Sequence, residues 1–600
     1  MRRTLHWALI PVLILVFALG LVACGDDDDD GDGGAAAGDF APVTAPPDDA
    51  KKGGTLTVVS AGDVDFLDPG AAYYQYTYMI MGGQQRALLF WPPDEIDEPQ
   101  PDLAEAQPTI SEDGKTITFK IRDGISYSPP VDREIRAADF KYAIERGLLP
   151  GVANPYIASY LGDLVGYAAA EQAVEQNPTV APNISGITTP DDRTLVLKLT
   201  QPTTSVAIQA LSLPLGAPVP EEYAKEFDAE SPSTYAEHVV ATGPYMIEND
   251  AEGNVTGYNP GREIILIRNP NWDPSTDDRP AYVDRIEVTA GFTDVNSATR
   301  RILTGDSQVQ GDIIPEPQGL KLAATEHPDQ LALNDSGGNR YISLNTQIPP
   351  FNDINVRKAV VAGFDREALR LARGGELVGP IATHFIPPNV PGFEEAGGED
   401  GPGFDFISNT QGDPQLAAEY FRKAGFESGR YEGPPILMIG ENAGVDRRVS
   451  EVVRDELAKL GFDVDARLVS SDTAYTRFCQ VPKSEYNVCA TTGWLKDFID
   501  PYTILEPTFN GENIIPTNNV NYPQLDVPAI NRAMAEAALV FDPEERAQAW
   551  GEIDKQVTAE APGVPYIWDD QPNVRSANVN GVLNLFNSQW DVAYSSLKNP

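Results

Sequence analysis

The sequence predicts an α/β protein with more than one domain, and three observations support this. The chain has 600 residues, more than one hydrophobic core usually organises. Its composition, 42% hydrophobic and 22% charged, is that of an ordinary globular protein. In residues 413–469, helix patterns and strand patterns alternate along the chain, as they do in βαβ units. We therefore expect strands joined by helices that cover them.

The first predicted elements are strands. Regular structure is expected to begin near Gly53, because residues 55–59 alternate between polar and apolar side chains. Residues 108–121 read as a hairpin whose turn is Asp113-Gly114, a common dipeptide of tight turns.

Helices and strands then follow each other in the second half. Asp413 and Pro414 begin a helix that Gly425 ends, and residues 436–439 form a buried strand. Asp446 opens a helix that is followed by a strand over residues 462–469, and its apolar side chains recur at helical spacing: Val449, Val452, Val453, Leu457 and Leu460. Asp542 caps a last helix, which leads into a strand over residues 564–568.

The N-terminus resembles a bacterial lipoprotein signal. Arg2 and Arg3 precede an apolar stretch, and Cys24 follows a small residue at its end. We expect cleavage before Cys24, lipidation of that cysteine and an extracytoplasmic location, with an uncleaved anchor as the alternative. Residues 24–52, which include five consecutive aspartates at 26–30, are expected to form a disordered acidic tether.

Charge and cysteine content narrow the function further. The formal net charge of −45 repels nucleic acid phosphates, so we expect no nucleic acid partner. In an oxidising compartment Cys479 and Cys489 are expected to form a disulfide, each in a stretch that could be one strand of a hairpin. No further cysteine or histidine lies near them, which argues against a metal site.

Motifs of common enzymes are absent from the sequence. There is no His-Glu-x-x-His pattern and no Gly-x-Ser-x-Gly pattern. We therefore expect no catalytic residue, no cofactor and no metal. A secreted hydrolase that uses paired carboxylates stays an alternative, because geometry rather than sequence spacing defines such pairs. A purely adhesive surface lipoprotein is a second alternative.

Several stretches in a fixed order carry a family resemblance. They are residues 102–145, 242–245, 268–272, 282–286, 342–366 and 413–426, followed by the motif Gly493-Trp494-Leu495-Lys496-Asp497. In this order they resemble family 5 of the extracytoplasmic solute-binding proteins of ABC importers, which includes oligopeptide- and dipeptide-binding proteins. The turn at Ser128 and the helix around Gly363 depart from the usual pattern.

The resemblance implies a two-lobed α/β fold of the periplasmic-binding-protein type (class II), with an extra domain and a ligand cleft between the lobes. The expected parts are the first lobe at 53–94, 241–336 and 566–600, the extra domain at 95–240, and the second lobe at 337–565. The chain is expected to cross between the lobes near Ser336 and Tyr566.

The resemblance also assigns site residues. Asp497 is expected to pair with the ligand's α-ammonium, while Gly493 and Trp494 flank the ligand backbone; Asp497 as a cap and Trp494 as a core residue are the alternatives. Of the tyrosines that follow Leu67-Asp68-Pro69, Tyr73 is the predicted cleft residue. Tyr156 and Tyr160 are expected to reach the cleft from the extra domain.

The function implied by the resemblance is capture of a short peptide by a monomeric, hinged protein that delivers it to membrane permease subunits. The same transport role for another solute, such as a sugar or a nickel complex, is the alternative.

Overall fold

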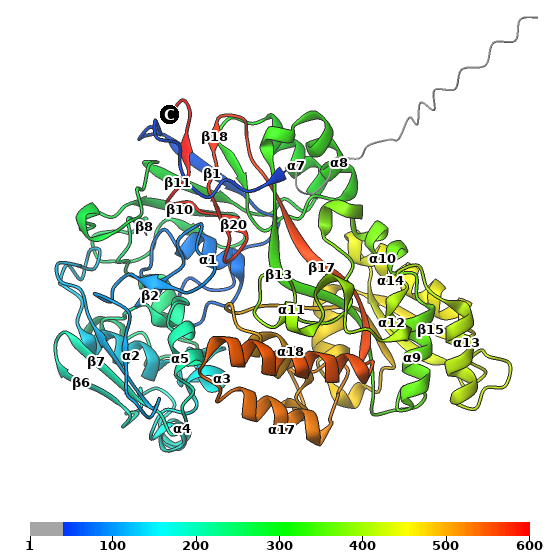
Figure 1. The fold of residues 1–600 in the computed structure, drawn as a ribbon. Helices are drawn as coiled ribbons and strands as arrows, with labels where there is room; N and C mark the ends of the chain where they lie inside the picture. Colours follow the sequence, from blue (N-terminus) through cyan, green and yellow to red (C-terminus); the bar gives the residue numbers. More distant parts are fainter. Residues whose placement is uncertain (1–39) are drawn as a thin grey trace, which may run out of the picture. The chain divides into compact units, whose positions relative to one another are not determined.

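The computed structural model describes residues 40–600, and its strands form three main sheets (Figure 1). The first sheet has the order β12-β1-β11-β10-β8, with β9 paired to β10. Its strands are β1 (Thr55–Val59), β8 (Tyr245–Ile247), β9 (Tyr258–Asn259), β10 (Glu263–Arg268), β11 (Arg285–Thr289) and β12 (Gln308–Gln310). β1 is parallel to both of its neighbours, β11 and β12, whereas β10 is antiparallel to β11.

The second sheet has the order β15-β14-β16-β13-β17. Its strands are β13 (Leu331–Leu344), β14 (Ile436–Glu441), β15 (Val464–Val469), β16 (Val488–Leu495) and β17 (Gly563–Val574). β14 and β15 are parallel and are joined by helix α14 (Gly444–Lys459), so the predicted βαβ unit is confirmed. Further helices of this part of the chain are α9 (Ile354–Gly363), α10 (Arg366–Arg373), α13 (Pro414–Lys423), α16 (Tyr502–Phe509), α17 (Pro528–Ala537) and α18 (Pro543–Ala559).

The third sheet has the order β4-β5-β7-β6. It consists of β4 (Thr109–Ile110), β5 (Thr116–Lys120), β6 (Ile187–Asp191) and β7 (Thr194–Lys198), with helices α2 (Ala137–Arg146), α3 (Ile157–Leu161), α4 (Tyr167–Gln176) and α5 (Thr204–Ala210) in the same stretch of chain. The predicted hairpin over residues 108–121 is β4 and β5.

Separate hydrophobic clusters underlie these sheets. Leu56, Val58 and Ile286 belong to the cluster of the first sheet, and Ile117, Phe119 and Leu195 to that of the third. Ile439, Tyr341 and Trp550 belong to a further cluster beneath the second sheet. The clusters do not coincide with the predicted domains, since the cluster of the third sheet also contains Tyr78 and Phe498 and that of the first sheet contains Tyr142. The domain boundaries stay a prediction.

The long antiparallel pair β13 and β17 runs from the neighbourhood of the first sheet into the second (Figure 1). Its outer end is tied to the first sheet, because Gln310 Nε2 donates to the Pro572 carbonyl over 2.7 Å and Gln310 Oε1 accepts from the Val574 amide over 3.1 Å. The pairing register shifts between Asp335 and Gly338, where Gly337 has a φ of +66°. This irregularity lies at the predicted crossing point Ser336.

Residues 40–52 pack against the rest of the protein, which corrects the expectation that they belong to a disordered tether. Phe40 is buried, the Val43 carbonyl accepts a hydrogen bond from the Leu583 amide over 2.8 Å, and Lys51 Nζ donates to the Lys598 carbonyl over 2.6 Å. These partners lie at the other end of the chain, so local composition could not indicate them. The signal peptide, Cys24 and the rest of the tether lie outside the described residues.

The disulfide between Cys479 and Cys489 has a Cα–Cα distance of 6.2 Å. Its surroundings differ from the expected hairpin. Cys489 lies on β16, but Cys479 ends a short helical segment, Tyr475–Cys479, which packs beside the strand rather than pairing with it. The bond thus fixes this helical segment to the strand that leads to Gly493.

Candidate functional site

A cavity of about 490 Å³ brings together segments that are far apart in the sequence. The chain before and within α1 (Gln75–Met81), the end of β12, the strands β13, β16 and β17, and the segment after β19 (Leu583–Asn584) all contribute side chains. Its lining includes Tyr73, Tyr74, Tyr78, Tyr156, Ile314, Arg340, Gly493, Trp494, Lys496, Asp497, Asp569 and Phe586. Five of the six predicted ligand-binding residues therefore line one cavity, and Tyr160 is the exception.

Asp497 lies two residues after the end of β16, and its carboxylate has a single hydrogen-bond partner within the described residues. Its Oδ2 accepts a hydrogen bond from the Tyr160 hydroxyl, and no cation within the described residues pairs with it. Burial raises the pKa of Asp497 to about 7, and the hydrogen bond from Tyr160 opposes that shift. A carboxylate in this state gains most from a ligand that brings a positive charge.

The helix-capping role considered for Asp497 is carried out by the nearby Asp500. Asp500 Oδ1 accepts from the Tyr502 amide over 2.8 Å at the start of α16, and both Asp500 oxygens accept from Arg546, over 2.8 and 2.9 Å. The capping role predicted for this aspartate-rich stretch is thus carried out by Asp500, which leaves Asp497 directed into the cavity.

The predicted tyrosines form a continuous stack beside Asp497. The ring centroids of Tyr73 and Tyr156 are 5.3 Å apart, and those of Tyr156 and Tyr160 are 5.7 Å apart. Tyr160 lies behind the cavity wall, where its ring meets Phe498 at 4.9 Å. Its role is to hold Asp497, whereas Tyr73 and Tyr156 face the cavity.

Gly493 and Trp494 both line the cavity and also pack against neighbouring parts of the fold. A Cβ atom on Gly493 would lie 2.5 Å from the Asn339 carbonyl oxygen and 2.6 Å from Arg340 Cδ, so β13 excludes a side chain there. The Trp494 indole N–H donates to the Thr503 carbonyl over 2.7 Å, and the ring packs against the cluster beneath the second sheet. Trp494 is therefore both a core residue and part of the cavity wall.

Sequence reasoning missed the cationic side of the cavity. Arg340, whose β13 position pairs with Gly493 on β16, donates through Nε to Asp569, which also accepts from Arg373 over 2.9 and 3.1 Å. Burial alone would raise the pKa of Asp569, but Arg340 and Arg373 hold it below its usual range. The two terminal nitrogens of Arg340 have no hydrogen-bond partner within residues 40–600. No motif could reveal this, since Arg340 and Asp569 meet only through strand pairing.

Lys496, the second cation of the cavity, is already engaged. Its Nζ donates to the Ser336 carbonyl over 2.9 Å at the irregular point of β13. Burial lowers the pKa of Lys496 to about 8, and attraction to Asp335 opposes that shift. Arg340 is thus the cation best placed to meet a ligand.

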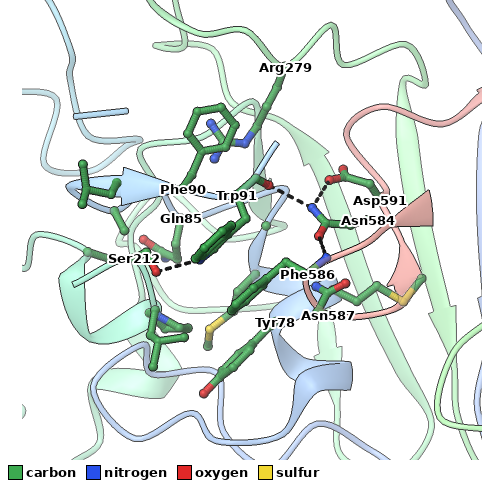
Figure 2. Close-up of a pocket in the computed structure, with 18 of the residues that line it drawn as sticks. Tyr78, Gln85, Phe90, Trp91, Ser212, Arg279, Asn584, Phe586, Asn587 and Asp591 are labelled. Carbon is green, nitrogen blue, oxygen red and sulfur yellow. Dashed lines mark hydrogen bonds between the residues drawn. The ribbon is translucent and has the colours of Figure 1, made fainter. Parts of the chain in front are cut away.

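A smaller cavity of about 100 Å³ adjoins the first, and Tyr78 and Phe586 line both (Figure 2). Its polar groups bond to one another: the Trp91 indole N–H donates to Ser212 Oγ over 2.9 Å, and Asn584 Nδ2 donates to the Trp91 carbonyl over 3.0 Å. The rings of Trp91 and Phe586 stack 4.8 Å apart and fill much of the wall. We therefore take the larger cavity as the candidate site.

Two further findings concern metals and membranes. Within residues 40–600, no cluster of histidine, cysteine, aspartate and glutamate side chains is arranged to hold a metal ion. Over the same residues, no helix has both the length and the apolar character that a membrane crossing requires.

Comparison with known proteins agrees with this architecture. The sequence model "Bacterial extracellular solute-binding proteins, family 5 Middle" matches residues 98–515. The oligopeptide-binding protein OppA of Bacillus subtilis is 24% identical, over 96% of this chain and 97% of its own. Heme-binding protein A of Haemophilus influenzae is also 24% identical, over 78% of each chain.

A solved structure gives the same result for the fold. The "Clavulanic acid biosynthesis oligopeptide binding protein 2" superposes with a TM-score of 0.78 and 25% identity, covering 94% of this chain and 99% of that one. The predicted α/β fold of the periplasmic-binding-protein type is thereby confirmed.

Proposed function

We propose that short peptides are the ligands of this chain, which belongs to family 5 of the bacterial extracellular solute-binding proteins. As a member of that family it is an extracytoplasmic solute-binding protein rather than an enzyme. The proposal is that the cavity encloses a short peptide with a free amino terminus, and that the closed protein delivers it to the permease subunits of an ABC importer.

The single observation that carries the peptide assignment is the state of Asp497. Its carboxylate is enclosed, has one hydrogen bond from Tyr160 and has no cation beside it within the described residues. An α-ammonium would supply both the charge and the additional hydrogen-bond donors that this carboxylate lacks. Selection for an unblocked amino terminus follows.

Arg340 supports a ligand that carries charges of both signs. Its terminal nitrogens are free to donate to a carboxylate, and its strand position pairs with Gly493, four residues before Asp497. Extended chain advances about 3.3 Å per residue, so the backbone positions of Gly493 and Asp497 are at most about 13 Å apart, a length comparable with that of a short peptide. A peptide's terminal ammonium and terminal carboxylate match this arrangement.

The proposal extends to where the protein acts. Lipidation at Cys24 would attach a monomer to the outer face of the cytoplasmic membrane, where it can meet the permease. Residues 1–39 are outside the described part of the chain, so this step rests on the sequence alone.

The first experiment identifies what the purified protein holds. Native mass spectrometry, followed by mild unfolding, is expected to release short peptides of mixed sequence. Release of a sugar or a metal complex instead would keep the solute-binding role and contradict the peptide assignment.

The second experiment tests Asp497 by calorimetric titration. Asp497→Asn is expected to weaken binding of a short peptide by about 100-fold, because a charge-assisted bond becomes a neutral one. The wild-type protein is expected to reject the N-acetylated form of the same peptide to a similar degree. Asp465→Asn is the matched control, since Asp465 is an exposed aspartate on β15 of the same sheet. Equal affinities for the wild type and Asp497→Asn would contradict the assignment.

A further inference from the structure

One edge of the cavity exposes apolar surface that the assignment of the peptide termini does not use. Phe66 is 52% exposed, Tyr73 36%, Tyr74 58% and Ile314 42%. We call these four residues the apolar shelf. Tyr73, Tyr74 and Ile314 line the candidate cavity itself. Large apolar side chains gathered at a cavity mouth commonly mark a binding surface.

One carboxylate holds the backbone of the three aromatic residues of the shelf, Phe66, Tyr73 and Tyr74. Asp65 Oδ2 accepts from the amides of Tyr73 and Tyr74, over 2.7 and 3.0 Å. Asp65 Oδ1 accepts from the Phe66 amide over 2.8 Å and from the Thr77 hydroxyl over 2.6 Å. The backbone that carries the exposed rings is therefore fixed before any ligand arrives, which lowers the entropic cost of binding.

The shelf is continuous with the site of the ammonium group. Tyr74 and Tyr73 meet edge to face with centroids 6.4 Å apart, and Tyr73 stacks in turn on Tyr156 and through it on Tyr160, which holds Asp497. A peptide whose ammonium meets Asp497 would place its first side chains on this side of the cavity, since consecutive residues are about 3.3–3.6 Å apart along an extended chain.

We infer that the apolar shelf is a side-chain subsite, and that the preferred ligands are peptides with an apolar or aromatic residue at one of their first two positions. This inference rests on the proposed function. The occupant is the ligand rather than another protein, because three of the four shelf residues line the same cavity as Asp497.

Calorimetric titration with three tripeptides tests the inference. Phe-Ala-Ala and Ala-Phe-Ala are compared with Ala-Ala-Ala, and at least one phenylalanine peptide is expected to bind the wild-type protein roughly tenfold more tightly, because the shelf buries its ring. The double variant Tyr74→Ser, Ile314→Ser is expected to lose this preference, so that the ratio of its affinities for the phenylalanine peptides and for Ala-Ala-Ala falls to about one. Val180→Ser is the matched control, since Val180 is 62% exposed and does not line the cavity.

The outcomes separate this inference from the function on which it rests. Binding of all three peptides with equal affinity, or a preference that survives in the double variant, overturns the subsite and leaves peptide binding intact. Binding of none of the peptides overturns both. A shelf variant that keeps its peptide preference but changes the oligomeric state in sedimentation assigns the shelf to contact with a second copy and also overturns the inference.

Discussion

Asp497 and Asp500 are three residues apart, yet the tertiary structure gives them opposite environments. Asp500 is buried with both oxygens on Arg546 and an additional bond from the Tyr502 amide. Asp497 faces the cavity with one tyrosine hydroxyl for a partner. The comparison teaches that a carboxylate satisfied within the fold supports stability, whereas one left without a cation is available to a ligand. Four predictions test this difference.

The largest effect is expected from Asp500→Ala. The Arg546 guanidinium would stay buried without its counter-charge, and removal of one partner of a buried pair costs about 3–5 kcal/mol. Urea unfolding followed by circular dichroism measures the loss of free energy of unfolding. The double variant Asp500→Ala, Arg546→Met is expected to recover part of it, because the unpaired charge is gone. Unchanged stability in Asp500→Ala would mean that Asp500 does not support the fold, and the proposed difference from Asp497 would be wrong.

The second prediction concerns the pH dependence of peptide affinity. With a pKa of about 7 in the free protein, Asp497 is mostly protonated at pH 5.5 and must lose that proton when it binds an ammonium. Peptide affinity is expected to fall by about tenfold between pH 8 and pH 5.5, because the loss of the carboxylate is partly offset by the peptide's own amino group, whose ordinary pKa of about 7.7–8.0 leaves it partly uncharged at pH 8. In Asp497→Asn the affinity should be low at both values and should not fall at the lower pH. A flat wild-type profile would mean that Asp497 does not change protonation on binding.

The third prediction concerns stability without ligand. A carboxylate whose pKa is raised by folding makes the folded state bind more protons, so stability decreases as the pH rises from about 4 through 7. Asp497→Asn removes this cost and is expected to increase the free energy of unfolding at pH 8 by about 1 kcal/mol, a value discounted because the cavity contains solvent. Denaturant unfolding at pH 8 and pH 5 should show a clearly larger gain at the higher pH. A lower stability of Asp497→Asn than of the wild type at pH 8 would mean that Asp497, like Asp500, stabilises the fold.

The smallest effect is expected from Tyr160→Phe. It removes one hydrogen bond to Asp497, which costs about 1 kcal/mol or less, and keeps the stack against Tyr156 and Phe498. Because that bond lowers the pKa of Asp497, its loss should move the midpoint of the affinity profile to higher pH. An unchanged midpoint would show that the hydroxyl does not influence the carboxylate.

The local sequence pattern predicted secondary structure well where capping residues and periodicity agree. Strand β1 and helix α13, which Asp413 caps, begin at the predicted residues, and α18 begins at Pro543 as expected. Helix α14 begins at Gly444, two residues before Asp446, although Ala443 is extended and Gly444 has a φ of +56°. Such boundaries depend on backbone geometry, which side-chain patterns indicate only to within a few residues.

Sequence patterns could not predict the contacts between distant segments. The packing of residues 40–52 against the C-terminal segment, the helical setting of Cys479 and the pairing of Arg340 with Asp569 all involve residues far apart in the chain or a local geometry without a motif. The apolar shelf is a similar case, since Tyr73 and Ile314 are far apart in the sequence and line one cavity only in the folded protein.

The sequence by itself determined the alternation of helices and strands, the order of the family stretches and hence the binding-protein fold, and it selected Asp497 through its motif. Only the tertiary structure decided that Asp500 rather than Asp497 pairs with Arg546, that Arg340 is the cation facing the cavity, and that Tyr160 holds Asp497 from behind. The physical reason is that periodicity and capping act within a few residues, whereas charge pairing and burial depend on which segments the fold brings together.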